Sequence, residues 1–339
     1  MKTSRFSIVS GTFAITTAIA LSGCGGENSD SDESALNVVT STNVYADIIS
    51  QIAGDDAEVT PVIDDPNQDP HSYEATSQDR LKLSKADLVV ENGGGYDAFM
   101  TTMLEASDAD PELLDVVSIS GLPGSDDLGN EPHDHGDDEG DEHDHGDDED
   151  GHDHEDEGHD HGEFNEHVWY SVPTMTKLVD EAATHLGEAV PEHQEEFIAN
   201  ADEYKKTLGE LRSQIDEVKK DHNGEKVAAT EPVPLWLFED MGLENITSNE
   251  FLEAVEEGND VPPLVLKKAE KQISDGEAVL LGYNTQAAGP QAEKLKSVAE
   301  KSDVPVIDLA ETMPADTNYA DWMGEYITTI STSLEGHKH

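Results

Sequence analysis

Residues 36–63, "LNVVTSTNVYADIISQIAGDDAEVTPVI", decide the fold expected for this chain of 339 residues. Two β-branched runs, at the start and the end of this stretch, flank a segment in which Val44, Ile48 and Ile52 recur at helical spacing. Strands that alternate with helices form a parallel sheet covered by helices. The stretch therefore predicts the first part of an α/β lobe.

The same alternation continues on both sides of one long helical segment. "ADLVVEN" and "LDVVSI" are typical of further strands in the first lobe, and "EKVAAT", "EAVLLGY" and "VPVIDLA" of strands in a second lobe. Between the lobes, apolar residues from Phe197 to Val218 recur at alternating spacings of four and three, which indicates one long helix that begins near Pro191 and ends at Gly224. Ligands of open α/β sheets bind outside the carboxyl ends of the strands, so we expect the site in the cleft between the lobes.

The chain is expected to divide into five parts, whose order follows from composition and periodicity. They are a lipoprotein signal peptide (1–23), an acidic linker (24–35), an N-terminal α/β lobe (36–172), helices that include the long linker helix (173–222) and a C-terminal α/β lobe (223–339).

The N-terminus has the features of an export signal that ends in a lipid anchor. Lys2 and Arg5 precede a short, mostly apolar segment that is interrupted by Ser, Thr and Gly, and this segment ends in "LSGC". This ending resembles a bacterial lipobox. Cys24 is the only cysteine, so no intramolecular disulfide and no cysteine-based zinc site is possible, and we expect Cys24 to be lipidated. The protein is accordingly expected to be extracytoplasmic and anchored to the cell membrane.

The overall charge excludes one class of partner. Asp and Glu number 76 against 19 Lys and Arg, and the formal net charge is -57. Nucleic acids are bound by clustered basic residues, so we expect no nucleic-acid partner. Such an acidic chain suits cations or a saline medium.

A tract within residues 126–163 holds four His-Asp-His triplets among carboxylates and has no apolar periodicity. We interpret it as an unstructured loop, because it offers nothing to bury. Neutral imidazoles two residues apart can share one ion, so the tract is expected to supply several weak, exchangeable metal sites. The histidines concerned are His133, His135, His143, His145, His152, His154, His159 and His161. We expect three other histidines, His185, His193 and His222, to lie on solvated helix surfaces.

Four polar residues outside the tract follow predicted strands or re-join the first lobe. They are His71 in "DPHSYEAT", His167 in "NEHVWYS", Glu231 in "ATEPVP" and Glu311 in "LAETMP". Two imidazoles and two carboxylates form a donor set that suits a divalent metal ion. Taken singly, each of these residues has an ordinary explanation as a surface, turn or helix-start residue.

Four segments resemble one known family in chain order. "DPHSYEATSQDRLKLSKADLVVENGGGYDAFM", "EHVWYSVPTM", "VAATEP" and "VIDLAETMP" are similar to the four ligand segments of the metal-binding solute-binding lipoproteins of bacterial ABC transporters, the zinc and manganese uptake family (cluster A-I). The resemblance covers about residues 36–334. It implies two helix-covered parallel-sheet lobes joined by a rigid helix, with the metal site between them, and a monomeric receptor that delivers its ion to an ABC transporter permease.

Carried over to these positions, the resemblance makes His71, His167, Glu231 and Glu311 the metal ligands. The chain departs from many zinc-type members at Glu231, where they have a histidine, and at Glu311, where the family usually has an aspartate. A water molecule in place of Glu311 therefore remains an alternative. The two imidazoles, the Irving–Williams order and a His-rich insertion before the second ligand favour Zn²⁺, with Mn²⁺ as the alternative cargo.

Two functions of other classes also compete. A zinc hydrolase would need an open coordination position and a separate general base, and no H-E-x-x-H or G-x-S-x-G motif is present. We therefore expect no enzyme activity. An extracellular zinc buffer or adhesin would depend on the acidic tract, and deletion of residues 126–163 would remove its binding, whereas a receptor would keep one tight site.

Overall fold

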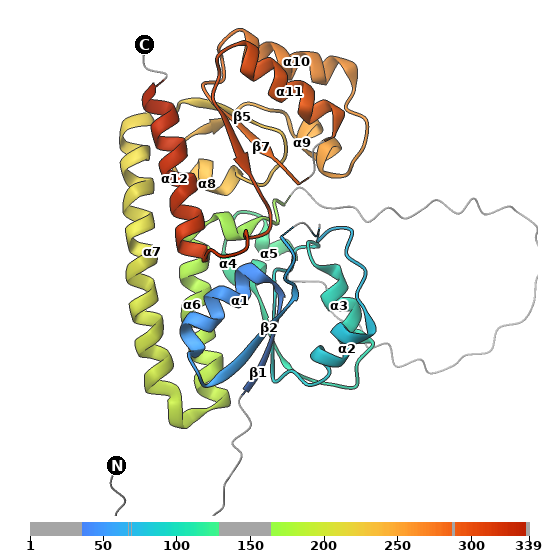
Figure 1. Cartoon of the computed structure of the whole chain (residues 1–339), viewed down its shortest axis with the longest axis vertical. Coiled ribbons are helices and arrows are strands. Elements are labelled where there is room, and N and C mark those ends of the chain that lie inside the picture. Colours follow the sequence, from blue (N-terminus) through green and yellow to red (C-terminus); the bar gives the residue numbers. More distant parts are fainter. Residues whose placement is uncertain (1–35, 67, 69, 129–163, 287–288, 337–339) are drawn as a thin grey trace, which may run out of the picture. The chain divides into compact units, whose positions relative to one another are not determined.

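Two parallel sheets of four strands each form the frame of the protein (Figure 1). The computed structural model describes residues 36–66, 68, 70–128, 164–286 and 289–336. Both sheets belong to one compact unit of the chain. The expected fold, with two helix-covered parallel-sheet lobes and one long helix, is confirmed.

The first sheet has the strand order β2-β1-β3-β4. Every neighbouring pair is parallel, with Val38 of β1 opposite Val59 of β2 and Leu88 of β3. The centre of the sheet is buried on both faces, which explains the continuous apolar runs of β1 and β3. The strands are β1 (Leu36–Thr42), β2 (Ala57–Ile63), β3 (Leu88–Glu91) and β4 (Glu112–Asp115).

The fourth strand is shifted from its expected place. The apolar run "LDVVSI" predicts a strand, but β4 ends at Asp115 and the run continues as the short helix α4 (Val116–Ser120). The Asp115 carboxylate accepts a hydrogen bond from the backbone N–H of Ser118 at 3.0 Å, which caps this helix. A short apolar run alone is compatible with either a buried strand or a buried helix, and here the cap at Asp115 favours the helix.

The second sheet repeats the arrangement with the strand order β6-β5-β7-β8. Its three longer strands are at the expected positions, while the two-residue edge strand β6 has too little sequence to be recognised. The strands are β5 (Lys226–Ala229), β6 (Glu244–Asn245), β7 (Leu281–Asn284) and β8 (Val306–Leu309).

Helix α7 (Gln194–His222) is the long helix expected from the sequence, and it packs against α1, α6 and α12 (Figure 1). Its buried residues Phe197, Leu208, Leu211, Ile215 and Val218 form the predicted apolar seam. Because this seam joins the same hydrophobic core as strands of both sheets, α7 stabilises the two lobes together.

The other helices cover the sheets or lie in the loops above them. They are α1 (Asn43–Ala53), α2 (Ser77–Leu83), α3 (Ala98–Glu105), α5 (Ser125–Leu128), η1 (Val168–Tyr170), α6 (Val172–Ala189), η2 (Pro191–His193), α8 (Leu235–Asp240), α9 (Asn249–Glu256), α10 (Pro263–Ser274), α11 (Pro290–Lys301) and α12 (Tyr319–Gly336). The helices α5, η1 and α9 were not expected from the sequence, and α5 corrects the start of the tract 126–163, whose first residues were expected to be unstructured. No helix in the described ranges has the length and apolar character that a membrane span requires.

Candidate metal centre

Three of the four ligand candidates lie in loops that follow the carboxyl ends of strands, and the fourth, His167, lies in the segment before η1. His71 lies between β2 and α2, and His167 directly precedes η1. Glu231 follows β5 and Glu311 follows β8. Parallel strands direct these loops to one edge of each sheet, which is why residues so far apart in sequence can meet.

Three of the four candidates meet closely. His71, His167 and Glu311 each offer a donor atom, and these atoms lie within 4.8 Å of one another. His71 Nε2 lies 3.6 Å from Glu311 Oε2. His167 is fully buried and Glu311 is 5% exposed. The arrangement is an N₂O donor set that includes residues of both lobes.

Glu231 reaches this set through an intermediary. The side-chain amide of Asn284 donates hydrogen bonds to Glu231 Oε2 and, at 2.7 Å, to Glu311 Oε1. All three side chains are buried. Glu231 therefore lies beside the donor set and is coupled to Glu311, although the described groups of donor atoms within 4.8 Å of one another do not include it.

The tautomer of His167 is fixed by a chain of hydrogen bonds. Asn165 donates from Nδ2 to the carbonyl of Pro232 at 3.0 Å, so its Oδ1 is the atom that faces His167. This oxygen accepts from the backbone N–H of His167 and lies 2.8 Å from Nδ1. Nδ1 must then carry the proton, which leaves the lone pair on Nε2, an atom with no hydrogen-bond partner in the described structure. Burial also lowers the pKa of His167, so the imidazole is neutral.

His71 and Glu311 form an ion pair between the two lobes. Burial opposes charge on His71, but the neighbouring Glu311 carboxylate prevails and raises the pKa of His71 to about 9. Burial raises the pKa of Glu311, but the charge of His71 and the hydrogen bond from Asn284 outweigh it and lower that pKa. A cation that binds here has to replace the His71 proton.

The loop that carries His71 is held at both ends. At its end, Thr76 Oγ1 accepts from the backbone N–H of Asp79 at 3.3 Å, and the Asp79 carboxylate accepts from the backbone N–H of Thr76 at 2.9 Å. The two bonds form a capping box for α2. At its start, the carbonyl of Pro66 accepts from Gln286 Nε2 at 2.6 Å and from Thr312 Oγ1 at 2.8 Å. The second contact ties this first-lobe loop to the loop that carries Glu311.

Two further carboxylates at the site were missed from the sequence. Glu256, at the end of α9, places Oε1 3.8 Å from His167 Nε2, and with Glu166 and His71 it forms a second group of donor atoms within 4.8 Å of one another. Burial and the charge of Glu166 raise the pKa of Glu256. A signal for α9 was present in "SNEFLEAVEEG", because Ser248, the apolar Phe251, Leu252 and Val255, and a following glycine mark an amphipathic helix.

Three histidines were expected to be solvated, and for His222 this prediction is wrong. His222 is 3% exposed and lies 3.1 Å from a Glu225 carboxylate oxygen. His185 and His193 are half-buried and pair with Glu112 and Asp56 at 2.7 and 2.8 Å. Helix position alone did not show that the last turn of α7 is covered by the second lobe.

Several predicted features lie outside the described residues. These are the signal peptide, the acidic linker with Cys24, and the tract histidines His133, His135, His143, His145, His152, His154, His159 and His161. Their expected roles stay predictions.

Comparison with known proteins identifies relatives among metal receptors. The sequence model of the ZnuA family, described as zinc-uptake complex component A, periplasmic, matches residues 38–333. The manganese-binding lipoprotein MntA of Halalkalibacterium halodurans is 28% identical over 201 residues, which cover 58% of this chain and 55% of that protein. The zinc-binding lipoprotein AdcA of Streptococcus pneumoniae is 27% identical over 188 residues, which cover 54% of this chain and 33% of that protein. The chain thus spans about half the length, or less, of these curated relatives.

Two solved structures have a similar fold. The periplasmic zinc-binding protein TroA of Treponema pallidum has a TM-score of 0.66 at 17% identity, over 88% of this chain and 99% of that one. The solute-binding protein FpvC of Pseudomonas aeruginosa, in complex with Ni²⁺, also has a TM-score of 0.66, at 20% identity, over 90% of this chain and 98% of that one. At this identity the likeness concerns the fold.

Proposed function

Because the chain belongs to the ZnuA family of metal-binding receptors of ABC transporters, we propose that it captures Zn²⁺ outside the cell membrane and delivers the ion to a membrane permease. The family consists of solute-binding receptors and not of enzymes, in agreement with the expectation from the sequence. Metal binding for transport is the family property, and the choice of Zn²⁺ is our proposal.

The observation that carries the proposal is the pair of imidazoles beside one buried carboxylate. His167 presents a neutral Nε2, and His71 lies next to Glu311 across the lobes. Nitrogen donors favour Zn²⁺ over Mn²⁺, and Zn²⁺ binds a given mixed site more tightly in the Irving–Williams order. We propose His71, His167 and Glu311 as ligands, with Glu231 either as the fourth ligand or as the partner that orients Glu311 through Asn284.

Manganese is the second candidate cargo, and the carboxylates favour it. Glu166, Glu231, Glu256 and Glu311 all lie at or beside the site, and hard oxygen donors suit Mn²⁺. The relative from Halalkalibacterium halodurans is named for manganese, whereas that from Streptococcus pneumoniae is named for zinc.

We also propose that Cys24 carries a lipid anchor that keeps the receptor at the membrane. The lipobox-like "LSGC" supports this, as do the lipoprotein names of the curated relatives. The His-Asp-His tract would then gather zinc near the site.

Metal competition tests the proposed function. The protein is dialysed against equal free Zn²⁺ and Mn²⁺, and the bound metals are measured by mass spectrometry, for the whole chain and for a variant without residues 126–163. We expect one tightly held Zn²⁺ in both, and loss of that ion in His71→Ala and His167→Ala. His185→Ala is the matched control, because His185 pairs with Glu112 away from the site. Retention of Mn²⁺ against Zn²⁺ would reverse the assignment, and loss of all tight binding with the tract would favour a metal buffer.

A further inference from the structure

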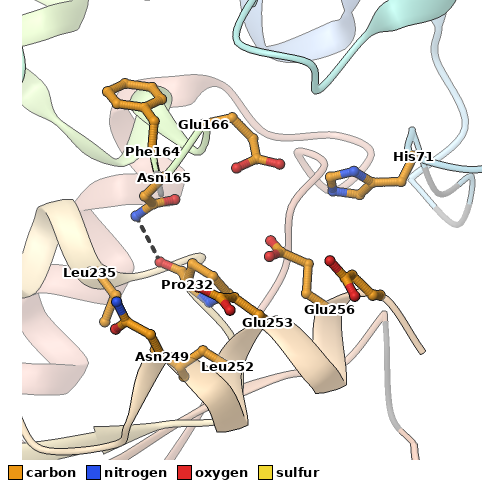
Figure 2. A pocket seen from close by; sticks show the side chains of 11 residues that line it. His71, Phe164, Asn165, Glu166, Pro232, Leu235, Asn249, Leu252, Glu253 and Glu256 are labelled. Carbon is orange, nitrogen blue, oxygen red and sulfur yellow. Dashed lines mark hydrogen bonds between the residues drawn. The ribbon is translucent and has the colours of Figure 1, made fainter. Parts of the chain in front are cut away.

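A cavity adjoins the donor set and gives it an opening (Figure 2). It measures about 240 Å³ and is bounded by His71, by the segment Phe164–Glu166 and by α9 with the residue that follows it. Its apolar wall includes Phe164 and Leu252, and its acidic wall Glu166 and Glu256. An ion that approaches His71 through this cavity meets the two carboxylates.

Three side chains converge in this cavity from three different segments. Figure 2 shows His71, Glu166 and Glu256 pointing toward one another. Each offers a donor atom, and these atoms lie within 4.8 Å of one another. The group shares His71 with the set of His71, His167 and Glu311, so one imidazole belongs to two adjacent sets of donors.

The Glu166 carboxylate interacts with the other two members of the group through its charge. Its residue is 6% exposed, and its negative charge raises the pKa of both His71 and Glu256. Its backbone is firmly held, because its carbonyl accepts from Asn92 Nδ2 at 2.9 Å and from the Val168 N–H at 2.7 Å. Two carboxyl groups so close together repel each other when both are ionised, and a cation bound between them would offset this repulsion.

Glu256 connects the cavity to the inner donors. Its Oε1 lies 3.8 Å from the lone-pair nitrogen Nε2 of His167, and neither atom has a hydrogen-bond partner in the described structure. An ion held by Glu256 is therefore already beside the imidazole that it would bind next.

We propose that His71, Glu166 and Glu256 form an outer site that a divalent cation occupies before it moves to the inner donors His167 and Glu311. The inference rests on the proposed function, since it describes how the captured ion arrives. His71 stays bound throughout, while Glu166 and Glu256 are exchanged for His167 and Glu311. Such stepwise ligand exchange avoids a fully released, dehydrated ion between the opening and the buried site.

Rates of zinc binding to the full chain test the outer site. Association is followed by stopped flow with a chromophoric chelator as competitor, and dissociation by transfer to excess chelator. In Glu166→Gln/Glu256→Gln we expect the association and dissociation rates to fall together, by about tenfold. An intermediate site lowers the barrier for the ion in both directions, and carboxylates near the opening raise the local concentration of cations. The equilibrium dissociation constant then changes little.

The control is Glu253→Gln/Glu257→Gln. Both residues are exposed and line the same cavity, so this double change removes the same number of formal charges without removing a donor of the group. We expect rates near those of the wild type. If zinc association and dissociation slowed equally in this control, general electrostatic steering would explain the effect, and the outer site would be overturned. Faster dissociation at unchanged association in the double variant would also overturn it, by making Glu166 or Glu256 ligands of the tightly bound ion.

A crystallographic measurement is independent of the rates. In His167→Ala/Glu311→Gln, zinc soaked into crystals of the full chain should give an anomalous peak among His71, Glu166 and Glu256, and the added changes Glu166→Gln/Glu256→Gln should remove it. No peak in the first variant contradicts the outer site. If the wild-type protein holds no tight zinc, the proposed function itself fails, whereas tight zinc with unaltered rates in the double variant rejects only this inference.

Discussion

His71 Nε2 and Glu311 Oε2 lie 3.6 Å apart, one in a loop of the first lobe and the other in a loop of the second. Each partner stabilises the charged form of the other, so the pKa of His71 is raised and that of Glu311 is lowered. A metal ion must take the place of a proton here.

The first prediction concerns this proton. With the pKa of His71 raised to about 9, His71 is protonated at neutral pH and zinc binding should release about one proton. Apparent affinity should then rise by about tenfold per pH unit up to about pH 9 and level off above it. Calorimetry in buffers of different ionisation enthalpy measures the release. The absence of proton release at about pH 7.5, where free histidines are largely neutral, would contradict the ion pair.

The second prediction ranks the two carboxylates of the second lobe. Glu311→Gln should weaken zinc binding by about a hundredfold, because it removes an anionic donor beside both imidazoles. Glu231→Gln keeps an oxygen that can accept from Asn284 and should cost about tenfold through the loss of a negative charge beside the donor set. Chelator competition gives both constants. If Glu231→Gln costs more than Glu311→Gln, Glu231 is the direct ligand.

The third prediction concerns Gln286, which joins the loops of His71 and Glu311. Its Oε1 accepts from the backbone N–H of Glu311 and, at 3.2 Å, from that of Thr312, while its Nε2 donates to the carbonyl of Pro66 at 2.6 Å. Gln286→Glu keeps the acceptor and loses the donor, and Gln286→Leu loses both.

We therefore expect zinc dissociation to become faster in the order wild type, Gln286→Glu, Gln286→Leu, because the ligand loops lose their connection stepwise. Stopped-flow transfer to chelator measures it. Lys301→Gln is a surface control, since Lys301 bonds only to Ser297 on the same helix among the described contacts. Equal rates in both Gln286 variants would show that only the bonds donated by Nε2, to the Pro66 carbonyl and to Thr312 Oγ1, matter.

The fourth prediction concerns the turn after β3. Gly93 has φ of 78°, and an added Cβ would lie 2.3 Å from Asp115 Oδ1, so Gly93→Ala combines backbone strain with a steric clash. Gly276 has φ of 72° with no atom within 4 Å of such a Cβ, so Gly276→Ala isolates the strain. Chemical denaturation should show a loss of about 1 kcal/mol for Gly276→Ala and at least about 2–3 kcal/mol for Gly93→Ala. Equal losses would mean that Asp115 moves away freely.

Much of the fold could be read from local patterns. The strands β1 and β2 and the helix α6 lie where β-branched runs and helical periodicity predicted them, since these signals are local and strong. The errors occur where the signal is short. The run after Asp115 is a capped helix and not a strand, and β6 has only two residues.

The residues of the site also fall into those that the sequence predicted and those that it did not. Residue type selected His71, His167 and Glu311, together with a position after a predicted strand or, for His167, at the return of the chain to the first lobe, and the fold brings the three together. Glu256 was missed because α9 was missed, and Glu166 because a glutamate in an acidic chain carries no distinguishing signal until its burial is known.

The sequence by itself determined the class of fold and the candidate donors, because strand and helix periods and the chemistry of imidazole are properties of residues and their neighbours. Only the tertiary structure decided which carboxylates face the histidines. Glu231 binds Asn284 beside the donor set, Glu311 pairs with His71, and Glu256 reaches His167 from α9. Such distances depend on how two lobes and their loops pack, and no local pattern in the chain encodes them.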